Sequence, residues 1–110
     1  MLLYGLIGYP LTHSFSKNYF TEKFKREGID NCRYENFQLV SIDDLPKVLV
    51  ENPNLAGLNV TIPHKESVLQ FINESSETVK EIGACNCIRI TDEGLAGYNT
   101  DVVGFEKSLS

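Results

Sequence analysis

The sequence of 110 residues has no long apolar run and no excess of positive charge. No segment approaches the ~20 consecutive apolar residues that span a bilayer, so a transmembrane helix is not predicted. Acidic residues outnumber basic ones by 15 to 10, which gives a net charge of −5. Because this balance disfavours polyanions, we expect neither nucleic acid nor a membrane as a partner.

The N-terminal segment 1–10 also lacks the basic region of a secretory signal peptide, and its apolar stretch meets a turn signal at Pro10. It is typical of a first strand. Three cysteines, Cys32, Cys85 and Cys87, are an odd number in a chain without a secretion signal, so we expect reduced thiols and a cytoplasmic protein. No histidine or cysteine pair has zinc spacing, and no metal site is expected.

Two catalytic signatures are missing as well. The chain has no G-x-S-x-G elbow, and its "GLIGYP" is not the G-x-G-x-x-G of a dinucleotide-binding loop. What is present is ordinary globular composition, with 42% hydrophobic and 23% charged residues, in a length that suits one domain.

Strands and helices are expected to alternate along the chain. Apolar runs predict strands at 2–9, 32–39 and 55–61, and a hairpin at 85–99 around the turn Asp92-Glu93-Gly94. Helical spacing and caps predict helices at 13–28, 41–52 with Pro46 in the first turn, after Pro63, at 74–83 and from about Asn99 onward. The predicted fold class is α/β in three layers: a mostly parallel sheet flanked by helices, with an antiparallel hairpin near the C-terminal end.

Polar residues follow several of the predicted strands. Ligands of such sheets bind outside the carboxyl ends of the strands, which gathers the segments 12–16, 61–65, 83–86 and 99–101 at one edge. Their hydroxyl, amide, ammonium and carboxylate groups suit a small polyhydroxylated acid better than an apolar ligand.

Lys65 and Asp101 both come just after a strand, each expected in the first turn of a helix. If they are adjacent, the lysine is a general acid or base whose partner orients it, and a solvated surface ion pair is the other interpretation. Other roles stay open in the same way. Ser16 suits a helix cap, His13 and His64 suit helix starts or packing, and Asn59 and Asn99 suit turns held by Asx bonds.

Four motifs in this order and spacing, "GYPLTHSFS", "GLNVTIPHK", "IGACN" and "GYNTDVVGF", closely resemble the N-terminal substrate-binding domain of the shikimate dehydrogenase family. The resemblance covers essentially the whole chain. It implies an NADP-dependent oxidoreductase that interconverts 3-dehydroshikimate and shikimate in aromatic amino-acid biosynthesis, a monomer or homodimer whose partner is that small-molecule substrate. It also implies that residues 1–110 form the substrate domain and that the NADP-binding Rossmann domain is not in this chain, so that the domain alone is inactive.

The resemblance further implies roles for single residues. Ser14 and Ser16 bind the substrate carboxylate, and Asn86 and Asp101 contact the ring hydroxyls. Asn59, Thr61 and Lys65 also belong to the substrate-binding set, and Lys65 with Asp101 forms the catalytic pair. Glu77 lies near the cofactor in some members of the family. Two substitutions depart from the common pattern: Cys87 stands where threonine is usual, and Lys17 where proline is frequent. A quinate-oxidising relative and a non-catalytic metabolite-binding module are the alternatives.

Overall fold

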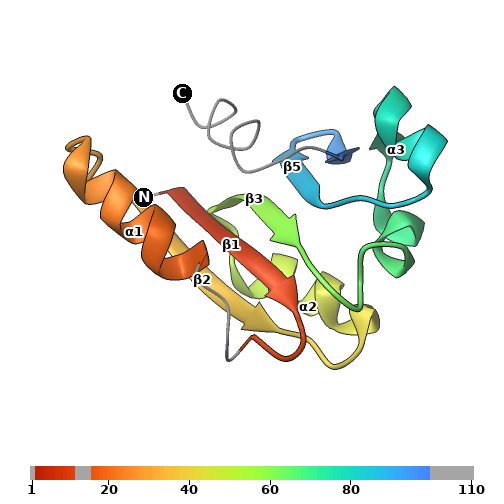
Figure 1. The fold of residues 1–110 in the computed structure, drawn as a ribbon, viewed down its shortest axis with the longest axis horizontal. Helices are drawn as coiled ribbons and strands as arrows, with labels where there is room; N and C mark the ends of the chain where they lie inside the picture. Colours follow the sequence, from red (N-terminus) through yellow and green to blue (C-terminus); the bar gives the residue numbers. More distant parts are fainter. Residues whose placement is uncertain (1, 12–15, 100–110) are drawn as a thin grey trace.

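The computed structural model describes residues 2–11 and 16–99, and of Ser16 the backbone only. Six strands form one sheet in the order β2-β1-β3-β5-β6-β4 (Figure 1). The strands are β1 (Leu2–Gly8), β2 (Cys32–Gln38), β3 (Leu55–Val60), β4 (Glu74–Ser75), β5 (Cys87–Thr91) and β6 (Gly94–Tyr98). The helices are α1 (Ser16–Arg26), α2 (Leu45–Glu51) and α3 (Glu77–Ile82), with 3-10 turns η1 (Ile42–Asp44) and η2 (Ser67–Phe71).

The sheet is mostly parallel, as predicted. β1 pairs in parallel with β2 and β3, and β6 pairs in parallel with β4. Within the described part of the chain β5 alone runs the other way, antiparallel to both β3 and β6. The hairpin expected at 85–99 is therefore confirmed as β5 and β6, and its turn is held by the Glu93 amide, which donates to Thr91 Oγ1 at 3.2 Å.

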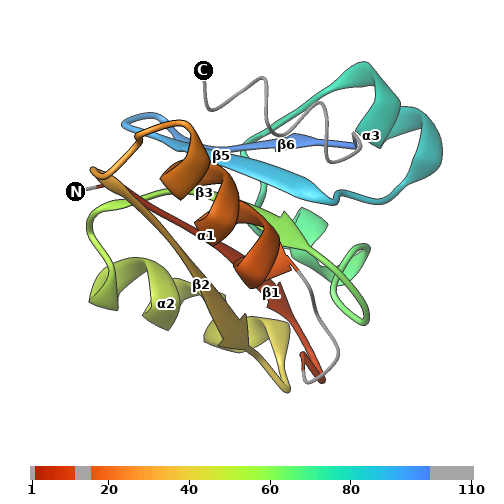
Figure 2. The same cartoon turned by 60° about the vertical axis from the view of Figure 1, so that its left-hand side comes forward.

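Each face of the sheet buries its own cluster of side chains, and helices cover both faces (Figure 2). One face carries a large aliphatic core under α2, η2 and α3. It comprises Leu3, Ile7, Leu39, Ile42, Leu45, Leu55, Leu58, Val60, Val68, Val79, Cys85, Ile88 and Leu95. The other face carries a smaller aromatic core under α1, which comprises Leu6, Leu11, Phe20, Phe24, Tyr34 and Cys87. The alternation of side chains along each strand divides the apolar residues between these two layers.

The prediction of a helix with Pro63 in its first turn is wrong. Pro63 lies in a turn, in which the His64 amide donates to the Thr61 carbonyl at 3.1 Å, and only a 3-10 turn follows at Ser67–Phe71. An α-helix would pair the Lys65 carbonyl with the amide four residues on. The Cys85 amide donates to that carbonyl instead, at 2.8 Å, because the corner is bound to the loop before β5.

The helix predicted at 74–83 is shorter than expected. Glu74 and Ser75 form the edge strand β4, and α3 begins after Ser76, whose Oγ accepts from the Val79 amide at 3.3 Å. Its predicted end at Gly83 is confirmed by a left-handed φ of 75°. The segment 41–52 divides into η1 and α2, with Pro46 in the first turn as predicted. The final predicted helix lies outside the described residues. No helix in the described part of the chain is both long and apolar enough to cross a bilayer.

Candidate functional site

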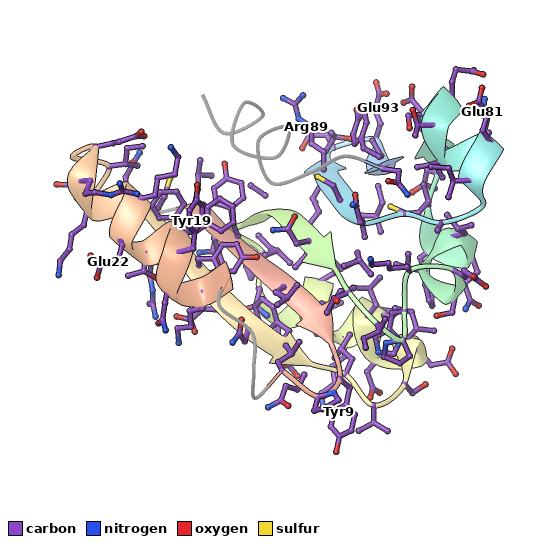
Figure 3. The ribbon with its side chains drawn as sticks, in the orientation of Figure 1. Tyr9, Tyr19, Glu22, Glu81, Arg89 and Glu93 are labelled. Carbon is purple, nitrogen blue, oxygen red and sulfur yellow. The ribbon has the colours of Figure 1, made fainter. Side chains whose placement is uncertain are left out.

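The corner after β3 is bound to the end of β1. The Thr61 amide donates to the Ile7 carbonyl at 2.9 Å, and the Tyr9 amide donates to the Ile62 carbonyl at 3.0 Å. Tyr9 itself points outward from the end of β1 (Figure 3). Gly8 allows this approach, since a Cβ at that position would overlap Thr61 Cγ2 and lie 3.0 Å from the Ile62 carbonyl oxygen. The corner therefore has a fixed place at the sheet edge.

His64 anchors the same corner from inside. Its side chain is 3% exposed, and its Nε2 forms a hydrogen bond with the Leu39 carbonyl just beyond β2. Its own carbonyl accepts from the Val68 amide at 2.9 Å. His64 is thus a packing residue, one of the interpretations drawn from the sequence. It leaves the neighbouring Lys65 side chain exposed at the edge.

Asn86 lies at the same edge, between the ends of β3 and β6. Its carbonyl accepts from the Val60 amide at 2.8 Å, and its amide donates to the Tyr98 carbonyl at 3.1 Å. The structure thereby brings Thr61, Lys65 and Asn86 together from two distant segments. Asn99 supports this loop, because its Nδ2 donates to the Ala84 carbonyl at 3.1 Å. That bond joins distant segments. The Asx bond considered for Asn99 would accept from the amide of residue 101, which lies outside the described residues, so it stays a prediction.

Asn59 does not hold an Asx turn. It lies inside β3 on the aromatic face, and its Nδ2 donates to the Tyr34 hydroxyl at 2.9 Å. In the register of the sheet, Asn59 and Asn36 both lie beside Leu6, from opposite sides. The buried Oδ1 of Asn36 has no hydrogen-bond partner among the described residues. Two side-chain amides therefore lie near the carboxyl ends of β2 and β3.

Sequence reasoning missed Tyr34 and Asn36. The signal for Tyr34 was a tyrosine at an inward position of a predicted strand, because a buried phenol generally needs a hydrogen-bond partner. Asn36 gave a comparable signal, an amide in a strand.

Glu77 is the first residue of α3 and is exposed, with its Oε1 3.7 Å from Lys80 Nζ. The helix begins beside the end of β6, where the Ser76 amide donates to the Gly97 carbonyl at 3.0 Å. Ser14 and Asp101 lie outside the described residues, and the backbone of Ser16 opens α1. The suggested ion pair of Lys65 and Asp101, and the cap at Ser16, stay predictions.

The two cysteines around Asn86 face different layers. Cys85 lies in the aliphatic core and Cys87 in the aromatic core, directly across from Asn59. Burial, and then the charge of the nearby Cys85, raises the pKa of the Cys87 thiol to about 12. Burial also raises the pKa of Cys85. Both thiols are therefore protonated near neutral pH and contribute no charge. Within residues 2–11 and 16–99, no group of three or more His, Cys, Asp or Glu side chains could hold a metal ion.

An α/β domain with hydroxyl, amide and ammonium groups at the carboxyl ends of its strands belongs to the class that binds small polar metabolites. Residues 6–88 match the family described as the shikimate dehydrogenase substrate binding domain. The chain belongs to this family.

Its relatives include the shikimate dehydrogenase (NADP(+)) of Pyrococcus abyssi, 40% identical over 111 residues, which cover 99% of this chain and 40% of the relative. The Thermus thermophilus shikimate 5-dehydrogenase, solved with NADP(H) and shikimate, has a TM-score of 0.81 at 31% identity, over 99% of this chain and 41% of that one. The 5-ketofructose reductase of a Gluconobacter strain has a TM-score of 0.82 at 30% identity, over 98% of this chain and 39% of that one. The chain thus spans about two-fifths of the length of these relatives.

Proposed function

We propose that this chain is the substrate-binding half of an NADP-dependent shikimate dehydrogenase, which interconverts shikimate and 3-dehydroshikimate. The convergence of Thr61, Lys65 and Asn86 at one sheet edge is the observation that carries the proposal. The names of the relatives, and the shikimate in the Thermus thermophilus structure, supply the substrate.

Lys65 is the group that handles the proton. The Cys85 amide holds the Lys65 backbone through a hydrogen bond to its carbonyl, while the Lys65 side chain remains exposed. The amine is therefore attached to a fixed segment of backbone. In the oxidation of shikimate the neutral amine takes the proton of the reacting hydroxyl, and in the reduction the ammonium returns it. Asp101 orients that hydroxyl and the amine. A bound nicotinamide cofactor would supply the hydride acceptor for the oxidation and the hydride donor for the reduction.

The remaining polar groups recognise the substrate. Ser14 and Ser16 bind the carboxylate, and Thr61, Asn86 and Asp101 bind the ring hydroxyls. Hydroxyl and amide groups suit this task because each both donates and accepts hydrogen bonds. Asn59 supports the same ring from the aromatic face.

Glu77 fits the nicotinamide end of the cofactor better than its phosphate groups. Glu77 is exposed beside the end of β6, and its carboxylate accepts hydrogen bonds from amide or hydroxyl groups but repels phosphate. We place NADP mainly on a second domain within the remaining length of the relatives, with Glu77 near its nicotinamide end. The partner of this domain is then a small-molecule substrate, in a cytoplasmic monomer or homodimer whose three thiols are free.

The test is the variant Lys65→Ala in the protein as the cell makes it. We expect a loss of turnover of at least 100-fold, since general acid–base catalysis contributes about 10²–10⁴-fold, with an unchanged thermal unfolding midpoint. Lys47→Ala is the matched control, because Lys47 is an exposed lysine on α2 that pairs only loosely with Glu51, at 3.8 Å. Near-normal turnover in Lys65→Ala would remove the assigned role.

The second candidate function is the reduction of a different polyhydroxy ketone, one that is not a cyclohexene acid such as 3-dehydroshikimate. The likeness to the Gluconobacter 5-ketofructose reductase favours it, since that enzyme matches the whole sheet at a comparable identity. Rates for 3-dehydroshikimate and 5-ketofructose, and for shikimate and quinate in the reverse direction, separate the substrates. Binding without any turnover would identify a non-catalytic module.

A further inference from the structure

Tyr34 places a phenol beneath the candidate site. Its side chain is 2% exposed on the aromatic face of β2, and its ring stacks on Phe20 of α1, with centroids 4.8 Å apart and planes at 18°. α1 begins at Ser16, a predicted carboxylate ligand. The ring thus joins the strand to the helix that carries one end of the site.

The phenol oxygen also reaches the site from the other direction. It accepts a hydrogen bond from Asn59 Nδ2 at 2.9 Å, although Tyr34 and Asn59 lie on β2 and β3, with β1 between them. Strands two places apart are separated by about 9.6 Å, so the bond needs the length of a tyrosine. Phenylalanine would fill the same space and make the same stack, but it would leave the amide without this partner.

The bond orients the Asn59 amide. A side-chain amide has donors on its nitrogen and acceptors on its oxygen, and it rotates freely unless one end is held. With Nδ2 donating to Tyr34, the carbonyl oxygen Oδ1 is kept on the side of the amide away from the phenol. A fixed acceptor suits a ligand hydroxyl and disfavours a carboxylate.

We propose that Tyr34 is a positioning residue for substrate recognition, which holds Asn59 so that its Oδ1 accepts from a hydroxyl of the substrate ring. The inference rests on the proposed function, and it adds a residue that lies outside the substrate-binding motifs. Tyr34 acts through Asn59 and does not touch the substrate.

The first measurement compares the kinetics of Tyr34→Phe with the unaltered protein as the cell makes it. We expect the KM for shikimate to rise about five- to tenfold, the size of one lost neutral hydrogen bond, while the KM for NADP+ stays within twofold. Tyr19→Phe is the matched control. It removes a phenol hydroxyl from an exposed ring on α1 that also contacts Phe20, edge to face at 5.1 Å (Figure 3).

A double-mutant cycle with Asn59→Ala then tests the route. Tyr34→Phe should have less than a twofold effect in the Asn59→Ala background, because no amide is left to position. An equal effect in both backgrounds would overturn the inference, as would an unchanged KM for shikimate in Tyr34→Phe. The proposed function fails if the unaltered protein does not turn over shikimate. If that protein does turn over shikimate but Tyr34→Phe leaves the KM unchanged, only the inference about Tyr34 fails.

A measurement on the unaltered protein covers the case in which Tyr34→Phe does not fold. The side-chain amide signals of Asn59 should move on addition of shikimate. Those of Asn52, whose Nδ2 donates to the Val48 carbonyl at 2.8 Å in α2, should stay. Asn59 signals that do not respond to saturating shikimate would overturn the inference.

Discussion

The two faces of the sheet are built from different side chains. The aliphatic core is the larger one, and its buried residues carry no hydrogen-bonding side chain apart from the Cys85 thiol. The aromatic core is smaller, and two of its members, Tyr34 and Cys87, lie directly beside Asn59. The difference indicates a division of tasks: the aliphatic face supplies most of the stability, whereas the aromatic face supports the polar groups of the candidate site.

A large cavity on the aliphatic face is the strongest way to test this division. Leu58 is fully buried there, so Leu58→Ala should lower the free energy of unfolding by about 3 kcal/mol, measured by urea denaturation. Val50→Ala, at a residue 80% exposed on α2, is the control and should change it by less than about 0.5 kcal/mol. In folded Leu58→Ala protein, the KM for shikimate should be normal. A raised KM would show that both faces support the site.

Gly8, the last residue of β1, lies against the corner that carries Thr61 and Lys65. Gly8→Ala should cost about 2 kcal/mol of stability, because the added methyl group overlaps Thr61 and lies 3.1 Å from Leu11 Cδ2. Since the displaced corner carries Thr61 and Lys65, kcat/KM for shikimate should fall at least tenfold.

Gly28→Ala is the matched control for Gly8→Ala. Gly28 follows α1 with a φ of 69° and has open space around it. An alanine there should cost about 1 kcal/mol through its left-handed backbone and leave the kinetics unchanged. Equal kinetic losses in the two glycine variants would contradict the role of Gly8.

The cap of α3 is a smaller test of the aliphatic face. Ser76→Ala removes the hydroxyl that accepts from the Val79 amide, and Val79 is a member of the aliphatic core. The free energy of unfolding should fall by about 1 kcal/mol. Ser76→Asp should restore most of it, since aspartate also caps helices. A loss that Ser76→Asp does not restore would point to packing instead of capping.

The smallest expected effect lies on the edge strand β2, at its ion pair with α1. Glu35 Oε2 lies 3.1 Å from Lys17 Nζ on α1, and Glu35 Oε1 lies 2.9 Å from Arg33 Nη2. Burial raises the pKa of Glu35, but the hydrogen bonds and charges of Lys17 and Arg33 outweigh it, so the pKa lies below its ordinary value. The stabilisation is therefore complete above about pH 4.3, the ordinary value for Glu, and is lost as the pH falls through the lower folded pKa.

Glu35→Gln should accordingly lower the stability at pH 7 by about 0.5 kcal/mol, the scale of a partly exposed ion pair. The difference from the unaltered protein should vanish in strong acid, as measured by thermal unfolding across pH. Glu22→Gln, at an exposed residue of α1, is the control. A difference that persists in acid would exclude the ion pairs as its cause.

Several elements could be predicted from the sequence because their signals are local. The apolar runs of β1 and β3, the turn at Asp92-Glu93, the first-turn Pro46 of α2 and the cap at Gly83 depend on residues a few positions apart. The two-residue strand β4 has no periodicity to detect. The helix after Pro63 failed as a prediction because the Lys65 carbonyl pairs with Cys85, a residue twenty positions away.

The sequence by itself determined the fold class, the family and the motifs that carry Thr61, Lys65 and Asn86, because these follow from residue types at fixed spacing. Only the tertiary structure decided that His64 packs against Leu39, that Gly8 makes room for Thr61, and that Tyr34 holds Asn59. Each of these contacts joins segments more than twenty residues apart. Their partners are chosen by the register of the strands and by the packing of the two cores, which no local pattern records.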